Sequence, residues 1–474
     1  MDTEEFRHEA HELVDWMADY MDTVRNLRVV PDVRPGEIRS QLAADPPESP
    51  ESFDRIFEDF RKIVVPGMTH WNHPGWFGYF PANTSPPSIL AEMLTAVIGA
   101  QCMSWQTSPA AAELEQVVME WLRRMLGLPH GFTGVIQDTA STATLVALLT
   151  ARERATGYAF AEKGAAAPGA DRLTVYASTE IHSSIDKGVK LAGIGLERLR
   201  KIPVDETYAL VPDALEEAIR RDVDRGLTPA CVVAVVGSTS STALDPLRPV
   251  GEICRRYRAW LHVDAAYAGT AAILPERRAI LDGIELADSF VFNPHKWMFT
   301  NFDCSAYFVQ DVDALVRTFS ITPEYLKTAH DAEVANFRDW GIQLGRRFRA
   351  LKLWFVIRAY GVEGLRSMIR RHIDLAEEFR GWVDAHPDFE VMAPAPLGLV
   401  CFRYRPHGAG SDGPDLDRLN ERLLAAVNET GRVHLTHTKL GGRYAIRMSI
   451  GQTRTSRREV EGAWRLFVER ASDL

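Results

Sequence analysis

Apolar positions in the first 25 residues recur at helical spacing. Phe6, Leu13, Met17 and Val24 fall on one side of a helix, and this pattern predicts an amphipathic helix over residues 6–24. A proline-rich stretch, residues 31–50, follows. Proline fixes φ and lacks a backbone N–H, so this stretch cannot be regular helix or central strand. We expect an extended arm that packs on a neighbouring surface.

Short apolar runs in the middle of the chain alternate with helix-like segments. Strands without polar alternation, separated by helices, are typical of a parallel sheet covered on both faces. The sequence therefore predicts an α/β domain with a mostly parallel sheet, and such sheets bind ligands beyond the carboxyl ends of their strands. The strand candidates are residues 173–177, 231–236, 260–263 and 289–292, and the helices between them include 212–221 and 249–257.

The pattern changes again after residue 361. A long helix is predicted over 365–385, strands over 399–404 and 444–449, and a final helix over 457–471. The glycines of 408–414 indicate a surface loop. We expect three units: a helical and extended segment over 1–85, a large domain over 86–360 and a small α+β domain over 361–474.

Composition excludes several classes of protein. The net charge of −10 over 474 residues argues against a nucleic-acid or anionic-membrane partner, because both require a concentrated basic surface. No apolar run approaches the ~20 residues of a membrane span. One basic cluster, Arg346, Arg347, Arg349 and Lys352, is interleaved with apolar residues. We expect it to form a solvated or dimer-facing stripe on a helix.

Cysteine use and the N-terminus bear on location. The five cysteines are widely spaced and form no Cys-x-x-Cys pair, which favours free thiols in a reducing compartment. The acidic start, Met1 to Glu5, has no apolar core of the kind found in signal peptides. We therefore expect a cytoplasmic protein.

Lys296 is the first candidate for chemistry. It follows the predicted strand 289–292 through Asn293, Pro294 and His295. A lysine at the carboxyl end of a strand can bind an aldehyde cofactor covalently, because burial and neighbouring cations lower its pKa. A lone lysine in a turn is usually a surface residue. The residues that the fold brings near Lys296 therefore determine whether it can bind a cofactor.

Asp264 directly follows the apolar run 260–263. A buried carboxylate is costly unless it is paired. A protonated pyridine nitrogen is a suitable partner, and the ion pair keeps the ring an electron sink. The alternative is an aspartate that caps a strand-to-helix turn.

Hydroxyl groups and a histidine follow two further strands. Thr139 and Ser141 lie between an apolar strand and a helix, where hydroxyls and free N–H groups can hold a phosphate. An ordinary helix cap fits equally well. His182 follows the strand 173–177 and could stack on a flat ring, although a lone histidine is usually structural.

Several motifs in order along the chain resemble the group II pyridoxal-5′-phosphate (PLP) decarboxylases, especially their aromatic-L-amino-acid branch and its bacterial members. They are Asn-Pro-His-Lys-Trp at 293–297, His-Val-Asp-Ala-Ala-Tyr at 262–267 and Ala-Ser-Thr-Ala-Thr-Leu at 140–145. Others include Pro-Gly-Met-Thr-His-Trp at 66–71, Tyr-Phe-Pro at 79–81 and Leu-Gly-Arg-Arg-Phe at 344–348. The resemblance implies a fold type I homodimer, intertwined through the N-terminal segment, with active sites at the subunit interface.

The resemblance also implies roles for individual residues. Lys296 would carry the cofactor and Asp264 would bind the pyridine nitrogen. His182 would stack on the ring and approach the substrate carboxylate. The remaining cofactor contacts would come from Thr139, Ala140, Ser141, Thr239 and Asn293, with His295 beside Lys296.

The reaction implied is loss of CO₂ from an aromatic L-amino acid. Tyr325, in a polar segment that resembles a catalytic lid, would donate the proton to Cα. In relatives, Phe at the Tyr325 position or Asn at the His182 position accompanies aldehyde formation, so Tyr and His favour simple decarboxylation. The substrate wall would consist of Trp71, Tyr79, Phe80, Pro81, Ala82, His182 and Phe302, with Met103 from this subunit or its partner, and with space left by Gly345.

The sequence departs from the family pattern at two positions, and three alternative functions must be considered. Asp138 stands where many relatives have Gly, and its side chain should point away from a phosphate. Ala82 replaces a Thr of several animal relatives. His8 and His11 suggest a metalloprotease, but their spacing of three is not that of the zinc helix motif, so no metal is expected. An aldehyde synthase or aminotransferase, and a non-catalytic PLP-fold protein, stay open.

Overall fold

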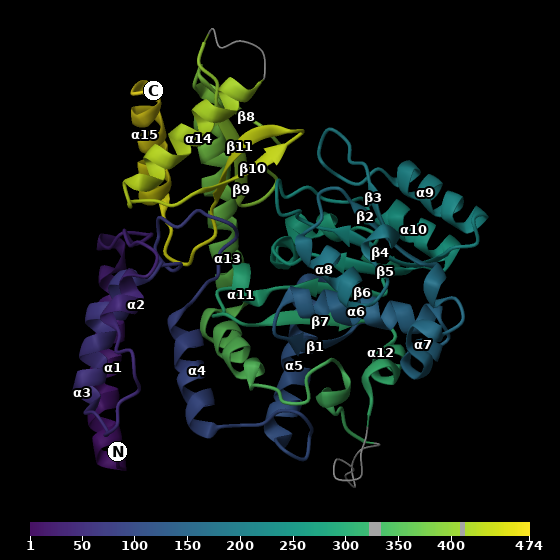
Figure 1. The fold of residues 1–474 in the computed structure, drawn as a ribbon, viewed down its shortest axis with the longest axis horizontal. Coiled ribbons are helices and arrows are strands. Elements are labelled where there is room, and N and C mark those ends of the chain that lie inside the picture. The colour runs from purple at the N-terminus through teal and green to yellow at the C-terminus, as the bar shows by residue number, and fades with distance from the viewer. Residues whose placement is uncertain (322–332, 408–412) are drawn as a thin grey trace.

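The computed structural model describes residues 1–321, 333–407 and 413–474 (Figure 1). A seven-stranded sheet forms the centre of the large domain, in the order β1-β7-β6-β5-β4-β2-β3. β7 runs antiparallel to both of its neighbours, and the other adjacent pairs are parallel. The prediction of a mostly parallel α/β sheet is confirmed. The strands are β1 Thr133–Gln137, β2 Leu173–Ser178, β3 Leu199–Ile202, β4 Thr228–Val235, β5 Trp260–Asp264, β6 Ser289–Phe292 and β7 Ser305–Val309.

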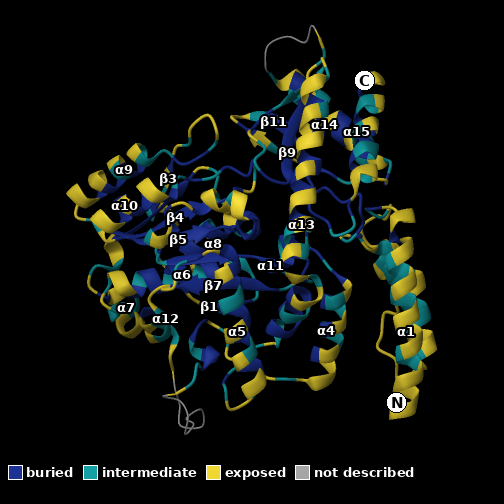
Figure 2. Cartoon of the chain, turned by 180° about the vertical axis from the view of Figure 1, so that it is seen from behind, coloured by how far each residue is buried: buried dark blue, intermediate teal, exposed yellow. Residues whose placement is uncertain are grey.

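Helices cover both faces of this sheet. Successive residues of β4 enter different buried clusters: Val232 and Ala234 pack on one face, and Cys231 and Val233 on the other. This explains why the inner strands β2, β4, β5 and β6 lack polar alternation, since they are buried on both sides (Figure 2). One face packs against α5 Pro109–Leu126, α9 Pro212–Asp224 and α10 Leu247–Tyr257, and the other against α6 Ala140–Ala155, α8 Ser183–Leu191 and α12 Val312–Phe319.

A second, four-stranded antiparallel sheet belongs to the C-terminal part of the chain, in the order β10-β11-β9-β8. One set of its buried residues, such as Val400, Phe402 and Ile446, forms a cluster of its own. Leu399, Cys401 and Ala445 belong instead to a cluster of the large sheet. The helix α13 Arg349–Ala385 leads into it and is broken at Gly361, whose φ is 63°. The elements are β8 Phe389–Val391, β9 Leu399–Tyr404, β10 Thr436–Leu440, β11 Arg443–Ser449, α14 Pro414–Glu429 and α15 Arg457–Ser472.

The N-terminal helix α1 Thr3–Thr23 lies beside α3 Phe53–Asp59, and together they project as an arm (Figure 1). α1 buries none of its residues. Its inner face meets α3 through Trp16, which packs edge-on against Phe57 and Phe60. The remaining α-helices are α2 Glu37–Gln41, α4 Pro86–Ile98, α7 Ala159–Lys163 and α11 Pro294–Trp297.

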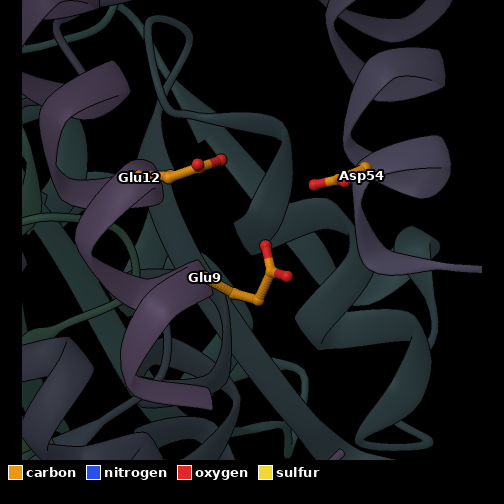
Figure 3. Close-up of side chains that lie close together, drawn as sticks. All are labelled: Glu9, Glu12 and Asp54. Atoms are coloured by element: carbon orange, nitrogen blue, oxygen red, sulfur yellow. The ribbon is translucent and has the colours of Figure 1, made fainter. Parts of the chain in front are cut away.

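Three carboxylates face one another across this arm (Figure 3). Oxygen atoms of Glu9, Glu12 and Asp54 lie within 4.8 Å of one another. The neighbouring His8 and His11 of the same helix are not part of this group. Acidic groups at a surface are common without a bound ion, so the cluster indicates no function by itself.

The prediction for the basic cluster is wrong. Arg346 pairs with the buried Glu115 at 2.6 Å, and Lys352, which is fully buried, pairs with Glu92 at 2.6 Å. Arg349 pairs with Asp303 at 2.8 Å. Opposite charges from distant segments therefore enclose most of this cluster, and only Arg347 keeps an exposed side chain.

The prediction that residues 31–50 form no regular helix is wrong at α2 Glu37–Gln41, which fits between Pro35 and Pro46. The other elements predicted from periodicity differ from the structure mainly at their ends. The helix predicted over 365–385 corresponds to the part of α13 that follows the break at Gly361, where φ is 63° and ψ is 168°. All five cysteines are free and buried. No helix of the described residues is both long and apolar enough to cross a membrane. The division at residues 85 and 360 stays a prediction.

Candidate active site

The carboxyl ends of parallel strands bring the candidate residues together. Thr139 follows β1, His182 follows β2, Thr239 follows β4, Asp264 ends β5, and Lys296 follows β6. They line one cavity of about 210 Å³. The predicted cofactor-site residues around this cavity are Thr139, Ala140, Ser141, His182, Thr239, Asp264, Asn293, His295 and Lys296.

Lys296 lies in the short helix α11, directly after β6. Its backbone N–H donates to the carbonyl oxygen of Asn293 at 2.9 Å. Burial lowers the pKa of the Lys296 amine, the Asp264 carboxylate partly opposes this shift, and Arg447 adds to it. A lowered pKa leaves more of the amine in its neutral, nucleophilic form.

Asp264 is 5% exposed at the end of β5. Its Oδ1 atom accepts a hydrogen bond from the Ala266 backbone N–H at 3.0 Å. It lines the cavity together with Lys296, and the two side chains interact electrostatically. A buried carboxylate with one backbone donor can bind a further positive group, such as a protonated ring nitrogen.

The N-terminus of α6 forms another wall of the cavity. Thr139 is the N-cap residue, and its hydroxyl accepts from the Thr142 backbone N–H at 3.3 Å. Ala140 and Ser141 open the helix, where backbone N–H groups have no intrahelical partner. These free N–H groups and the positive end of the helix dipole suit a phosphate group.

Asp138 does not line this cavity. Its Oδ2 atom accepts a hydrogen bond from the Gln343 side chain at 3.2 Å. Its Oδ1 atom accepts from the backbone N–H and the hydroxyl of Thr139, at 2.5 and 3.3 Å. The carboxylate therefore joins the segment that precedes α13 to the N-cap residue of α6, and it lies beside that helix N-terminus without lining the cavity.

Two histidines lie beside Lys296. His182 keeps exposed surface because it faces the open cavity, while surrounding protein lowers its pKa. Its Nδ1 atom accepts from the Ser184 backbone N–H at 3.2 Å. His295 is 4% exposed, its Nδ1 accepts from the Cys304 N–H at 2.9 Å, and burial lowers its pKa to about 3. Both imidazoles are therefore neutral at pH 7.

An apolar pocket of about 520 Å³ adjoins the cavity. The two share Phe80, His182, His295, Lys296 and Phe302, so a molecule in the pocket can reach the Lys296 amine. The predicted substrate-wall residues around the pocket are Trp71, Tyr79, Phe80, Pro81, Ala82, His182 and Phe302. Trp71 and Tyr79 stack at 5.6 Å between ring centroids, a surface that suits an aromatic side chain.

Two predicted substrate contacts do not line the pocket within this chain. The Met103 carbonyl accepts a hydrogen bond from the Arg338 backbone N–H at 2.8 Å, and Gly345 lies close to Gln101. Neither belongs to the residues around the pocket. Tyr325 lies outside the described residues.

Sequence reasoning missed two residues that support the site. Arg447 of β11 lines the pocket, is 4% exposed and lies 5.3 Å from the centre of the Phe80 ring. Asn83 is fully buried and donates to the carbonyl oxygen of Lys296 at 2.7 Å. A charged residue inside the apolar strand 443–449 was a usable signal for Arg447, whereas nothing in the local sequence marks Asn83.

The residues present fit PLP. The cavity offers a nucleophilic amine at Lys296, a buried carboxylate at Asp264 and a helix N-terminus with free N–H groups. These three groups match the aldehyde, the pyridine nitrogen and the phosphate of that cofactor.

Comparison with known proteins agrees with this fit. Residues 35–405 match the family model described as the pyridoxal-dependent decarboxylase conserved domain. The chain is 44% identical to a tyrosine decarboxylase 2 of Narcissus pseudonarcissus, over 100% of this chain and 95% of that protein. It is 43% identical to a phenylacetaldehyde synthase of Arabidopsis thaliana, over 100% and 97%.

A solved structure shares the whole fold. The crystal structure of Oryza sativa TDC with PLP and tryptamine superposes with a TM-score of 0.96 at 39% identity, covering 100% of this chain and 99% of that one. From the match over residues 35–405 and these similarities, we conclude that the chain belongs to the pyridoxal-dependent decarboxylase family.

Proposed function

We propose that this decarboxylase acts on an aromatic L-amino acid and releases CO₂ and the corresponding arylalkylamine. The observation that carries the proposal is the aromatic pocket that opens directly onto Lys296. Relatives named for tyrosine and tryptophan decarboxylation support it. Tryptophan, tyrosine, phenylalanine and their hydroxylated forms are the candidate substrates.

PLP, when bound, supplies an electron sink for the electron pair that departing CO₂ leaves behind. We assign the Lys296 amine to covalent attachment of the cofactor and the Asp264 carboxylate to its ring nitrogen. The phosphate is assigned to Ala140, Ser141 and Asn293, with the Thr139 hydroxyl close by. Thr239 is assigned to the wall of the cofactor pocket.

The substrate is assigned to the other side of the site. His182 would meet the ring and the substrate carboxylate, and its neutral imidazole can donate a hydrogen bond from Nε2 because Nδ1 already accepts one. The His295 side chain would hold the adjacent wall. Tyr325, outside the described residues, is assigned to donate the proton to Cα.

A second function, aromatic aldehyde formation by decarboxylation and oxidative deamination, has specific support. The phenylacetaldehyde synthase of Arabidopsis thaliana is nearly as similar to this chain as the tyrosine decarboxylase. The presence of His182 and Tyr325 favours the decarboxylase.

We further propose a homodimer. The surface of α4 exposes Leu90, Leu94, Val97 and Ile98 at 45–73%, an apolar row of the kind that partner subunits cover. Phe6 and Val14 of the arm are exposed as well. A second copy on this surface could supply Met103 to the neighbouring pocket. The five free cysteines support a reducing, cytoplasmic location.

The decisive experiment incubates the PLP-loaded protein with tryptophan, tyrosine, phenylalanine and DOPA separately. Amine and CO₂ in equal amounts, without aldehyde, ammonia or hydrogen peroxide, are expected. Aldehyde as the main product would favour the second function. Absence of turnover with all four acids would contradict the aromatic assignment, and sedimentation of the same sample at the monomer mass would contradict the dimer.

A further inference from the structure

A separate cavity of about 360 Å³ lies between the segment after α1 and the small domain. None of its lining residues belongs to the cofactor cavity. Its walls are joined by backbone hydrogen bonds: Val29 N–H to the Gly431 carbonyl at 2.8 Å, and His434 N–H to the Gly75 carbonyl at 3.0 Å. The walls are therefore held in place by the fold.

The lining of this cavity is strongly basic. Arg25, Arg28, Arg432 and Arg458 all line it, in a chain whose net charge is −10. All four side chains are exposed, and among the described residues no carboxylate lies within 4.0 Å of any of these four guanidinium groups. Four guanidinium groups around one cavity, without a paired carboxylate, give it a positive potential that attracts an anion.

Among the described residues, Glu459 is the one acidic residue that lines this cavity. Its carboxylate is already engaged, because it accepts hydrogen bonds from the backbone N–H and the hydroxyl of Ser456, at 3.1 and 2.6 Å, in the capping box of α15. It therefore leaves the arginines without direct neutralisation.

One hydrogen bond and one packing contact place the exposed Arg28 side chain at the cavity wall. Its Nη2 atom donates to the Glu429 carbonyl oxygen at 3.1 Å. Its guanidinium also packs on Gly431, where an added Cβ would lie 2.6 Å from the Arg28 Cζ atom. Gly431 has φ of +68°, so both its conformation and its missing side chain permit this approach.

His73 adds an unsatisfied group to the same wall. It is 4% exposed, and its Nδ1 atom accepts from the Gly75 backbone N–H at 2.8 Å. The Nε2 atom is buried and has no partner of hydrogen-bonding geometry among the described residues, although the Arg25 backbone is near enough to raise its pKa. Burial outweighs that effect and lowers the pKa, so His73 is neutral with a proton on Nε2.

We propose that this cavity binds a phosphate-type oxyanion, either inorganic phosphate or a small phosphomonoester. The planar guanidinium group presents paired N–H donors that match phosphate oxygens. A bound anion would tie the segment 25–28 to the small domain through Arg432 and Arg458. The site is independent of the aromatic-substrate proposal.

The test uses holoenzyme freed of unbound PLP, so that the cofactor's phosphate site is filled. Inorganic phosphate and glycerol 3-phosphate are titrated separately against chloride at constant ionic strength. Binding is followed by the thermal unfolding midpoint and by ³¹P relaxation of the added phosphate. Because the wall donors are charged, Arg432→Gln/Arg458→Gln should weaken binding by at least about tenfold.

Two variants provide the comparison. Arg432→Lys/Arg458→Lys keeps the charge and should retain most of the affinity. Arg422→Gln removes an exposed arginine of α14 that is not in the cavity lining and should bind as the wild type does. Tighter binding of glycerol 3-phosphate than of phosphate would identify a phosphomonoester, and the reverse would identify the free ion. The proposal would be overturned if chloride raised the thermal unfolding midpoint as much as phosphate does. It would also be overturned if Arg432→Gln/Arg458→Gln bound phosphate as tightly as the wild type.

Discussion

The guanidinium group of Arg447 donates a hydrogen bond of 2.7 Å to the backbone carbonyl oxygen of Thr239. It also donates to the Ser240 carbonyl oxygen at 3.2 Å and to the Thr436 hydroxyl at 3.0 Å. Arg447 belongs to β11 of the small sheet, whereas Thr239 follows β4 of the large one. This arginine therefore fixes a loop of the candidate active site from the other sheet.

Replacing Arg447 with Met should lower kcat/KM by at least about tenfold, since each lost charge-assisted hydrogen bond is worth about 1.5–3 kcal/mol. Arg447 also lowers the pKa of Lys296, so its removal should raise that pKa. The pH dependence of the holoenzyme's absorbance should then move to higher pH. A residue that only stabilised the fold would not produce this movement.

Arg422→Met is the matched control, because Arg422 is an exposed arginine of the same small domain. It should leave both kcat/KM and the absorbance titration unchanged. Arg447→Lys keeps the positive charge but loses the planar guanidinium group with its several N–H donors. It should therefore change the pH dependence of the absorbance less than it changes kcat/KM. A wild-type titration and kcat/KM in Arg447→Met would contradict the positioning role.

Lys296→Ala should abolish covalent cofactor attachment and lower amine formation at least about a thousandfold. Among the described residues, Lys296 is the one lysine that lines this cavity. The measurements are the cofactor absorbance after borohydride treatment and dialysis, and the rate of CO₂ release. Lys190→Ala, which removes an exposed lysine of α8, should behave as wild type. Retention of borohydride-fixed cofactor by Lys296→Ala would exclude the assigned role.

Tyr325→Phe removes the hydroxyl assigned to protonate Cα. A positioned general acid contributes about 10²–10⁴-fold, so amine formation should fall by at least about a hundredfold. Aldehyde and ammonia should appear in its place. Product analysis by mass spectrometry, with oxygen consumption measured in parallel, checks this. Unchanged amine turnover would rule out the donor role.

Much of the active site was predictable because its residues follow apolar strands. Lys296, Asp264 and His182 each lie just after such a run, and parallel strands place their carboxyl ends at one edge. Arg447 and Asn83 escaped prediction because their contacts join residues 208 and 213 positions apart. No local pattern encodes such pairing.

The same limit explains the error at the basic cluster. Periodicity identified a helix after residue 348 correctly, but not what faces it. Glu92 comes from α4, Glu115 from α5, and Asp303 from the loop before β7. Their approach depends on the assembled fold, so the charges of the cluster looked unpaired in the sequence.

Stability should fall as the pH drops from about 6.5. Burial lowers the pKa of His372 from 6.5 to about 3, so the unfolded chain binds a proton in this range that the folded chain does not. The contribution of neutral His372 to the free energy of unfolding is present above pH 6.5 and is lost progressively as the pH falls towards 3. By pH 5 the loss reaches about 2 kcal/mol for one such group. His262 and His295 have lowered pKa values too and act in the same direction.

His372→Asn tests this effect at a residue that lines neither cavity of the active site. The Nδ1 atom of His372 accepts from the Trp297 indole N–H at 3.0 Å, and an Asn oxygen can accept the same bond. Urea unfolding between pH 5 and 8 should give a shallower pH dependence in the variant. His407→Asn, at an exposed histidine, should keep the wild-type slope. An equal slope in His372→Asn would refute the assignment.

The buried pair of Glu115 and Arg346 gives the largest expected stability change. Glu115 accepts from Arg346 at 2.6 Å and from the Ile136 backbone N–H at 2.8 Å. Glu115→Ala leaves a buried guanidinium and a backbone donor without this acceptor, which should cost about 3–5 kcal/mol of unfolding free energy. Gln116→Ala, one position along the exposed side of α5, should change it little.

The double variant Glu115→Ala/Arg346→Met separates charge from packing. Since Met removes the unpaired charge, part of the lost stability should return. Urea unfolding of the wild type, Glu115→Ala, Arg346→Met and the double variant forms a double-mutant cycle. The cycle measures the coupling free energy between Glu115 and Arg346. A double variant no more stable than Glu115→Ala would mean that packing around Glu115, rather than the buried charge of Arg346, accounts for the loss.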